Sequence, residues 1–174
     1  MSGEERQRVR IFLADGHRLV REGIRRILEA EPDLEVIGEA DDGEQAVKLS
    51  RELKPDVIIM EARLGRLDSV EATRRVKAQH PDAIIIVLTA YEDEEYVADM
   101  IRAGAGGCLL KSTDAEKLVQ AIRLMKDGLF VSDLAVEQRI LKQAARPRSV
   151  AVDFGQHLTR REAEVLKLVA DGRN

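Results

Sequence analysis

Short apolar runs alternate along this chain with longer segments in which apolar residues recur every three or four positions. The runs cover residues 9–14, 34–37, 57–60, 84–88 and 108–110. The longer segments have the spacing of amphipathic helices. They cover residues 17–30, 43–53, 70–80 and 92–103, and a fifth begins at residue 114. Five alternations of strand and helix predict an α/β fold, with a parallel sheet covered by helices on both faces.

The run at residues 57–60 is predicted to be a central strand, because consecutive apolar residues suit a strand buried on both faces. Polar residues follow the strands. They are Asp15, Glu61, Thr89 and Lys111. In open parallel sheets, ligands bind beyond the carboxyl ends of the strands. The sequence therefore predicts a site where two acids, a hydroxyl and an ammonium group converge.

Composition narrows the class of protein. Aromatic residues make up 3% of the 174 residues and there is no Trp, which argues against a stacking platform for single-stranded nucleic acid. A single cysteine excludes an internal disulfide and fits a reducing compartment. The N-terminus has no apolar stretch of signal-peptide length, and no run is long enough to span a membrane. We expect a cytoplasmic protein without a membrane partner.

The pattern changes after residue 127. Residues 128–157 read as a linker that contains a helix, and residues 158–174 read as a further helix. Thr159 and Glu162 have the spacing of a capping box at its start, and Gly172 suits its end. The first 127 residues hold the whole strand–helix pattern, so we place one domain at residues 8–127.

Residues 9–126 resemble the receiver domain of NarL/FixJ-type response regulators. The stretches that carry the resemblance are residues 13–17 (LADGH), 19–23 (LVREG), 88–91 (LTAY) and 109–111 (LLK). Residues 158–174 resemble the first helix of a LuxR-type helix-turn-helix domain. The resemblance implies a (βα)5, doubly wound, flavodoxin-like receiver, followed by a linker and a truncated helix-turn-helix segment. It also implies a transcriptional response regulator of two-component signal transduction.

Receivers of this family take a phosphoryl group from a sensor histidine kinase onto an aspartate, with Mg²⁺ bound beside it. Here the phosphoacceptor position holds Glu61, and Gly16 replaces the second member of the acidic pair that begins with Asp15. The resemblance leaves Asp15, Glu61 and the backbone carbonyl of Arg63 as metal ligands. With one carboxylate missing, we expect weak Mg²⁺ binding or none, and no other cofactor.

The remaining site positions follow from the same resemblance. Thr89 and Lys111 match the family's phosphoryl-site partners, whereas Cys108 replaces the aromatic residue of the switch position. His17 lies close to Asp15 in the sequence, but its place at a helix start favours a structural role over a catalytic one.

Three interpretations of Glu61 stay open. Its carboxylate could mimic a phosphoryl group by pairing with Lys111, or the site could be inactive while signalling runs through partners. Residual phosphorylation is the third, and it is disfavoured because glutamate is one methylene longer than aspartate. A misplacement of about 1 Å can cost roughly a hundredfold in rate.

The expected partners follow from the two resemblances. The full-length parent would bind DNA, have a sensor histidine kinase as a partner, and form a homodimer through residues 97–103 and 116–125. The truncated chain would touch only the DNA backbone, through Arg160, Arg161 and Lys167. The alternative is a stand-alone pseudo-receiver that acts as a phosphorylation-independent interaction module. An enzyme is disfavoured, because a hydrolase on this scaffold needs an aspartate at position 61.

Overall fold

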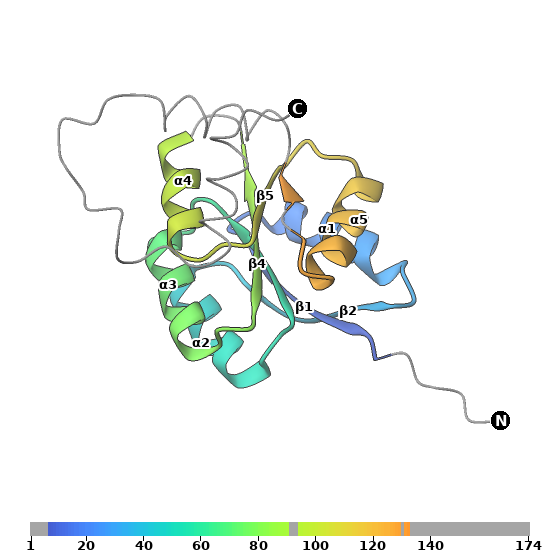
Figure 1. The fold of residues 1–174 in the computed structure, drawn as a ribbon, viewed down its shortest axis with the longest axis horizontal. Helices are drawn as coiled ribbons and strands as arrows, with labels where there is room; N and C mark the ends of the chain where they lie inside the picture. Colours follow the sequence, from blue (N-terminus) through green and yellow to red (C-terminus); the bar gives the residue numbers. More distant parts are fainter. Residues whose placement is uncertain (1–6, 91–93, 130, 133–174) are drawn as a thin grey trace.

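A computed structural model describes residues 7–90, 94–129 and 131–132 of the chain (Figure 1). One parallel sheet has the strand order β2-β1-β3-β4-β5-β6. Its strands are β1 (Val9–Ala14), β2 (Leu34–Ala40), β3 (Val57–Glu61), β4 (Ile84–Thr89), β5 (Gly107–Leu110) and β6 (Val131–Ser132). The helices are α1 (Arg18–Glu29), α2 (Gly43–Leu53), α3 (Ser69–Gln79), α4 (Glu94–Arg102) and α5 (Ala115–Lys126). The predicted (βα)5 receiver fold is confirmed.

Helices cover both faces of the sheet and enclose two separate cores. In Figure 1, α2, α3 and α4 lie on one side of the sheet, and α1 and α5 lie on the other. Successive strand residues point to opposite faces. In β1, Phe12 packs into the core beneath α2, α3 and α4, whereas Ile11 and Leu13 pack into the core beneath α1 and α5. The alternation along one strand therefore fills both cores.

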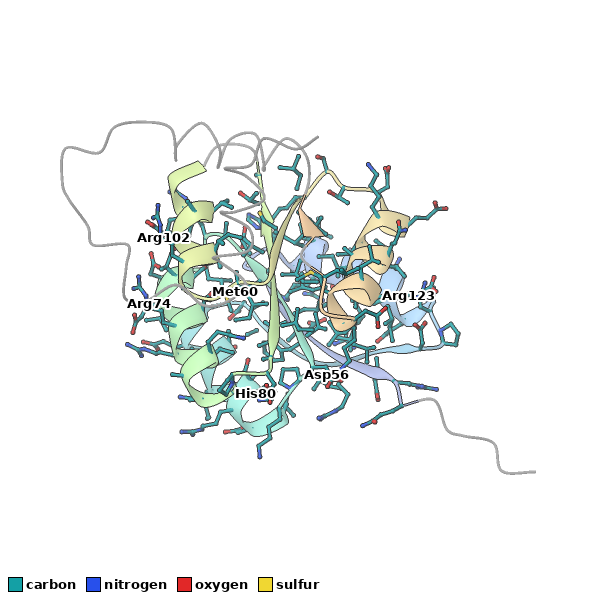
Figure 2. The ribbon with its side chains drawn as sticks, in the orientation of Figure 1. Asp56, Met60, Arg74, His80, Arg102 and Arg123 are labelled. Atoms are coloured by element: carbon teal, nitrogen blue, oxygen red, sulfur yellow. The ribbon has the colours of Figure 1, made fainter. Side chains whose placement is uncertain are left out.

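The central strand is β3, as the sequence predicts. All five of its residues are buried, and the side chain of Met60 lies in the core, where the hydroxyl of Thr73 in α3 is 3.5 Å from its sulfur (Figure 2). The less regular pattern of residues 34–37 predicts a strand near an edge, and β2 is an edge strand. The strand order reverses between β1 and β3, and in open α/β sheets ligands bind beyond the carboxyl ends of the strands at such a point.

The opposite edge holds a strand that the sequence analysis does not predict. β6 is two residues long and pairs in parallel with β5. A strand this short has no periodicity to recognise. It adds a strand to the sheet beyond residue 127, where the sequence analysis ends the domain.

The expectations for the C-terminal part fall outside the described residues. These are the linker helix, the helix at residues 158–174 and the DNA-backbone contacts of Arg160, Arg161 and Lys167. Among the helices that the structure describes, none has both the length and the apolar character of a membrane span.

Candidate functional site

Two buried carboxylates lie at the point where the strand order reverses. Glu61 is the last residue of β3, and Asp15 directly follows β1. These strands pair with each other in parallel, so their carboxyl ends share one edge of the sheet. Asp15 is 3% exposed and Glu61 is 8% exposed. Carboxylates this well buried need partners, because an unpaired buried charge is costly.

Lys111 supplies the compensating charge. It follows β5, and its backbone N–H donates to the carbonyl of Thr89 at 2.8 Å, which extends the sheet to this position. Its Nζ lies 2.5 Å from Oε1 of Glu61 and 2.9 Å from Oδ2 of Asp15. Burial alone would lower the pKa of Lys111, but the hydrogen bonds to Glu61 and Asp15 outweigh it and raise that pKa above its usual value. Lys111 is therefore a fixed ammonium between two carboxylates.

Glu61 is held at its second oxygen as well. The backbone N–H of Gly16 donates to Oε2 of Glu61 at 2.9 Å. The carboxylate is thus bound on one side by an ammonium and on the other by the backbone of the β1–α1 loop. Both oxygens are engaged by groups of the chain itself.

His17 lies in the same cluster. It is the N-cap residue of α1, as its position in the sequence suggests, but its side chain does not cap the helix. Its Nδ1 lies 3.1 Å from Oδ1 of Asp15 and 3.2 Å from Oε1 of Glu61. The position of His17 in the sequence predicted a helix-start residue and no contact with the site. Its position two residues after Asp15 was the available signal for a contact with the site.

Asp15, His17 and Glu61 each offer one possible metal-ligand atom, and these atoms lie within 4.8 Å of one another. Arg63, whose carbonyl was predicted as a further ligand, lies in the loop after β3. Its guanidinium carbon is 5.6 Å from the ring centroid of Tyr96 in α4.

Thr89, the predicted phosphoryl-site partner, and Cys108, at the predicted switch position, are both buried in the sheet. Thr89 ends β4 and is buried, and its hydroxyl donates to the carbonyl of Ala90 at 3.2 Å. Cys108 is fully buried in β5, where it pairs with Val87 of β4. The structure therefore brings Asp15, Glu61 and Lys111 into direct contact, while Thr89 lies at the same edge with its hydroxyl on a neighbouring carbonyl.

Tyr96 connects α4 to the loop after β3, a contact that the sequence analysis did not predict. Its hydroxyl accepts the backbone N–H of Ser69, the first residue of α3, at 3.1 Å. Burial, and then the hydrogen bond with Asp68, raise the pKa of Tyr96. An aromatic residue thus lies between α4 and α3, although the switch position in β5 holds Cys108.

Comparisons with known proteins agree with this fold. A family model for the response regulator receiver domain matches residues 11–123. The chain is 37% identical over 179 residues to the transcriptional regulatory protein DegU of Brevibacillus brevis, across 95% of this chain and 76% of that protein. It is 39% identical over 165 residues to the transcriptional regulatory protein LiaR of Bacillus subtilis, across 95% and 78%.

Solved structures of response regulators have the same fold as this chain. A LuxR-family two-component response regulator from Aurantimonas sp. SI85-9A1 superposes with a TM-score of 0.74 and 34% identity, over 80% of this chain and 100% of that one. The receiver domain of the response regulator NarL from Mycobacterium tuberculosis gives a TM-score of 0.67 and 29% identity, over 71% and 99%. The chain therefore belongs to the response regulator receiver family and is a two-component response regulator of the LuxR/NarL type.

Proposed function

We propose that this response regulator works without ordinary phosphorylation of its receiver, because Glu61 stands at the phosphoacceptor position with its carboxylate already bound. The observation that carries the proposal is the double contact of Glu61, to Nζ of Lys111 at 2.5 Å and to the N–H of Gly16 at 2.9 Å. A nucleophilic carboxylate needs a free oxygen aligned with phosphorus. Here one oxygen is paired with an ammonium and the other with a backbone donor.

The length of the Glu61 side chain also disfavours phosphorylation. Glutamate is one methylene longer than aspartate, so its carboxylate extends past the point from which an aspartate oxygen would attack. A misplacement of about 1 Å can cost roughly a hundredfold in rate. Phosphoryl transfer depends on the position of the nucleophile and on neutralisation of the phosphoryl oxygens. The longer side chain of Glu61 and its occupied oxygens should therefore both slow it.

The donor set also fits Mg²⁺ poorly. Mg²⁺ binds oxygen ligands in a near-ideal octahedron and dehydrates reluctantly, and Gly16 offers no carboxylate to hold it. The ammonium of Lys111 already lies between Asp15 and Glu61, where it repels a second cation. We propose that the receiver binds Mg²⁺ weakly, on the order of millimolar or worse, as the loosest oxygen-ligand sites do.

Among the three interpretations of Glu61, the contacts favour a receiver fixed in one state. The pair of Glu61 with Lys111 is what a phosphoryl mimic requires. The hydroxyl of Thr89, however, donates to Ala90, and Cys108 offers no ring for an aromatic switch. A complete mimic would engage Thr89 as well, so we propose a locked receiver whose state does not depend on a kinase.

The output is proposed to be regulation of transcription in the cytoplasm, through dimerisation and DNA binding. The matches to DegU and LiaR, both named transcriptional regulatory proteins, extend over 95% of this chain and support this function over a stand-alone interaction module. On this proposal the protein is a regulator and not an enzyme. A sensor kinase would be a binding partner and not a phosphoryl donor.

Intact-mass measurement after incubation with acetyl phosphate and Mg²⁺ tests the proposal. The chain is expected to gain no phosphoryl adduct. The matched control is the double variant Gly16→Asp/Glu61→Asp, which restores both acidic positions and should gain one adduct that Lys111→Met abolishes or weakens. A high-occupancy adduct on the unaltered chain contradicts the proposal.

A further inference from the structure

The loop that leaves the Glu61 site is tied to α4 by two hydrogen-bonded residues, Ser69 and Tyr96. We propose that Tyr96 is a positioning residue that couples this loop, residues 62–69, to α4, so that a change at Glu61 alters the local stability of α4. The coupling runs through hydrogen bonds within the chain and does not require phosphorylation of Glu61. It therefore goes beyond the proposed function.

The loop is held at both of its ends. Ala62 directly follows Glu61, and its backbone N–H donates to the carbonyl of Leu88 in β4 at 2.8 Å. Further along, the backbone N–H of Leu64 donates to Oγ of Ser69 at 2.9 Å, and Ser69 is fully buried. Buried hydrogen bonds hold one geometry, because breaking them leaves polar groups unpaired. A displacement of Glu61 is therefore passed along the loop to the start of α3.

Tyr96 holds the same loop from α4. Its hydroxyl accepts the backbone N–H of Ser69 at 3.1 Å and donates to the carboxylate of Asp68, the N-cap residue of α3. The guanidinium carbon of Arg63 lies 5.6 Å from the centroid of the Tyr96 ring, within the range of a cation–π contact. Tyr96 is half-buried and packs against the core beneath α2, α3 and α4. A single side chain of α4 therefore contacts the loop at Arg63, Asp68 and Ser69.

The position of α4 gives this connection its consequence. In Figure 1, α3 and α4 lie next to each other on the same side of the sheet, and the two helices are in contact. The predicted switch position in β5 holds Cys108, which has neither a ring nor a hydroxyl, whereas Tyr96 supplies both from α4. Most of α4 lies within residues 97–103, which we expect at a dimer interface. The coupling therefore connects the Glu61 site to that surface.

Amide hydrogen exchange of residues 97–102 tests the proposal in four versions of the whole chain: unaltered, Glu61→Gln, Tyr96→Phe and the double variant. Glu61→Gln removes the charge that binds Lys111. It should speed exchange in α4 at least about twofold, the low end of the coupling that mutations between two sites produce. Tyr96→Phe keeps the ring, removes the hydroxyl and should also speed exchange. The double variant should exchange at the rate of Tyr96→Phe alone, because α4 is then no longer coupled to Glu61.

A purely structural role of Tyr96 predicts a different result for the double variant. Two independent destabilising changes multiply their effects on exchange, because the free energies of uncoupled sites add. Multiplied rates in the double variant would overturn the proposal, and so would unchanged exchange of α4 in Glu61→Gln. The matched control is Tyr91→Phe, at the only other tyrosine of the sequence and outside the described residues. Glu61→Gln should still speed exchange in that background, and loss of the effect there would overturn the assignment to Tyr96.

Ser69→Ala tests the other hydrogen bond of the connection. It removes the Oγ that accepts the N–H of Leu64 and keeps the N–H that donates to Tyr96. In this background too, Glu61→Gln should no longer speed exchange in α4, and a retained effect would contradict a connection through the loop. A phosphoryl adduct on the unaltered chain would instead contradict the proposed function, and the mass measurement reports that separately.

Discussion

The backbone N–H of Gly16 donates to Oε2 of Glu61 at 2.9 Å, and a Cβ added at Gly16 would lie 3.5 Å from that same oxygen. Glu61 and Gly16, two positions at which the sequence was expected to depart from the receiver pattern, are therefore in contact. Space alone does not require glycine here, since 3.5 Å is an ordinary van der Waals distance. A carboxylate at position 16, however, would point its charge at Glu61.

This contact predicts the effect of Gly16→Asp in the unaltered background. Three carboxylates would share one ammonium, so the folded state should lose roughly 1–2 kcal/mol at pH 7. The loss comes from repulsion between ionised carboxylates, so it should be smaller at pH 4 than at pH 7. Urea unfolding at pH 7 and pH 4 measures it. Gly16→Asn has a similar shape without the charge, and an equal loss in that variant would count against the explanation.

Lys111→Met should leave Asp15 and Glu61 without their shared cation. We expect a loss of about 2 kcal/mol of unfolding free energy at pH 7, because hydrogen bonds to charged groups are lost and two buried carboxylates remain. The pKa of Lys111 is raised in the folded state. Its stabilisation is therefore complete below the unfolded value of 10.5 and is lost as the pH rises through the folded value.

The control for that variant is Lys126→Met. Nζ of Lys126 lies 3.4 Å from Oδ1 of Asp56, in an exposed pair, so its removal should change stability by less than about 0.5 kcal/mol. An equal loss of unfolding free energy in the two lysine variants would show that the buried contacts of Lys111 with Asp15 and Glu61 stabilise the fold no more than an exposed ion pair does.

Substitution by alanine should have opposite effects on stability at Gly38 and at Gly23. A Cβ at Gly38 in β2 would lie 2.6 Å from Cδ1 of Leu53 and 3.0 Å from the ring of Phe12, so Gly38→Ala should cost roughly 1–3 kcal/mol. Gly23 lies inside α1, and among the described residues no atom beyond its chain neighbours and its own helix backbone stands within 4 Å of an added Cβ. Gly23→Ala should therefore stabilise the chain by about 0.5–1 kcal/mol. Thermal unfolding of both variants checks the pair, and a stabilised Gly38→Ala variant would contradict the packing of β2.

Tyr96→Phe tests the connection between α4 and α3. The variant leaves the N–H of Ser69 without its acceptor, which should cost about 1 kcal/mol in urea unfolding at pH 7. Burial raises the pKa of Tyr96 above its unfolded value of 10.0. The stabilising effect of the hydroxyl is present below pH 10 and is lost as the pH rises through the folded value. Unchanged stability at pH 7 would mean that this hydrogen bond contributes nothing to folding.

The elements that the sequence predicts well are those with a strong pattern. Residues 57–60 of β3 form a continuous apolar run, and the strand is buried throughout. Asp15 and Lys111, which follow two other strands, meet at one edge because parallel strands share a direction. β6 escapes prediction because two residues carry no periodicity.

The contacts within the site are harder to predict for a different reason. The contact of Gly16 with Glu61 joins positions 45 residues apart and depends on the register of β1 against β3. The direction of the His17 side chain depends on the backbone of the loop, where its own N–H is bound by Asp15. The position of His17 in the sequence predicted a helix start but did not indicate which way its ring would point.

The central claim is that the carboxylate of Glu61 binds the ammonium of Lys111, and a pH titration of the Lys111 side chain by NMR tests it most directly. In the unaltered chain, the pKa of Lys111 should lie above its usual value of 10.5. Glu61→Gln keeps the size of the side chain and removes its charge, so the pKa of Lys111 should fall in that variant. A Lys111 that titrates at its usual value in the unaltered chain, or equally in both proteins, would contradict the account.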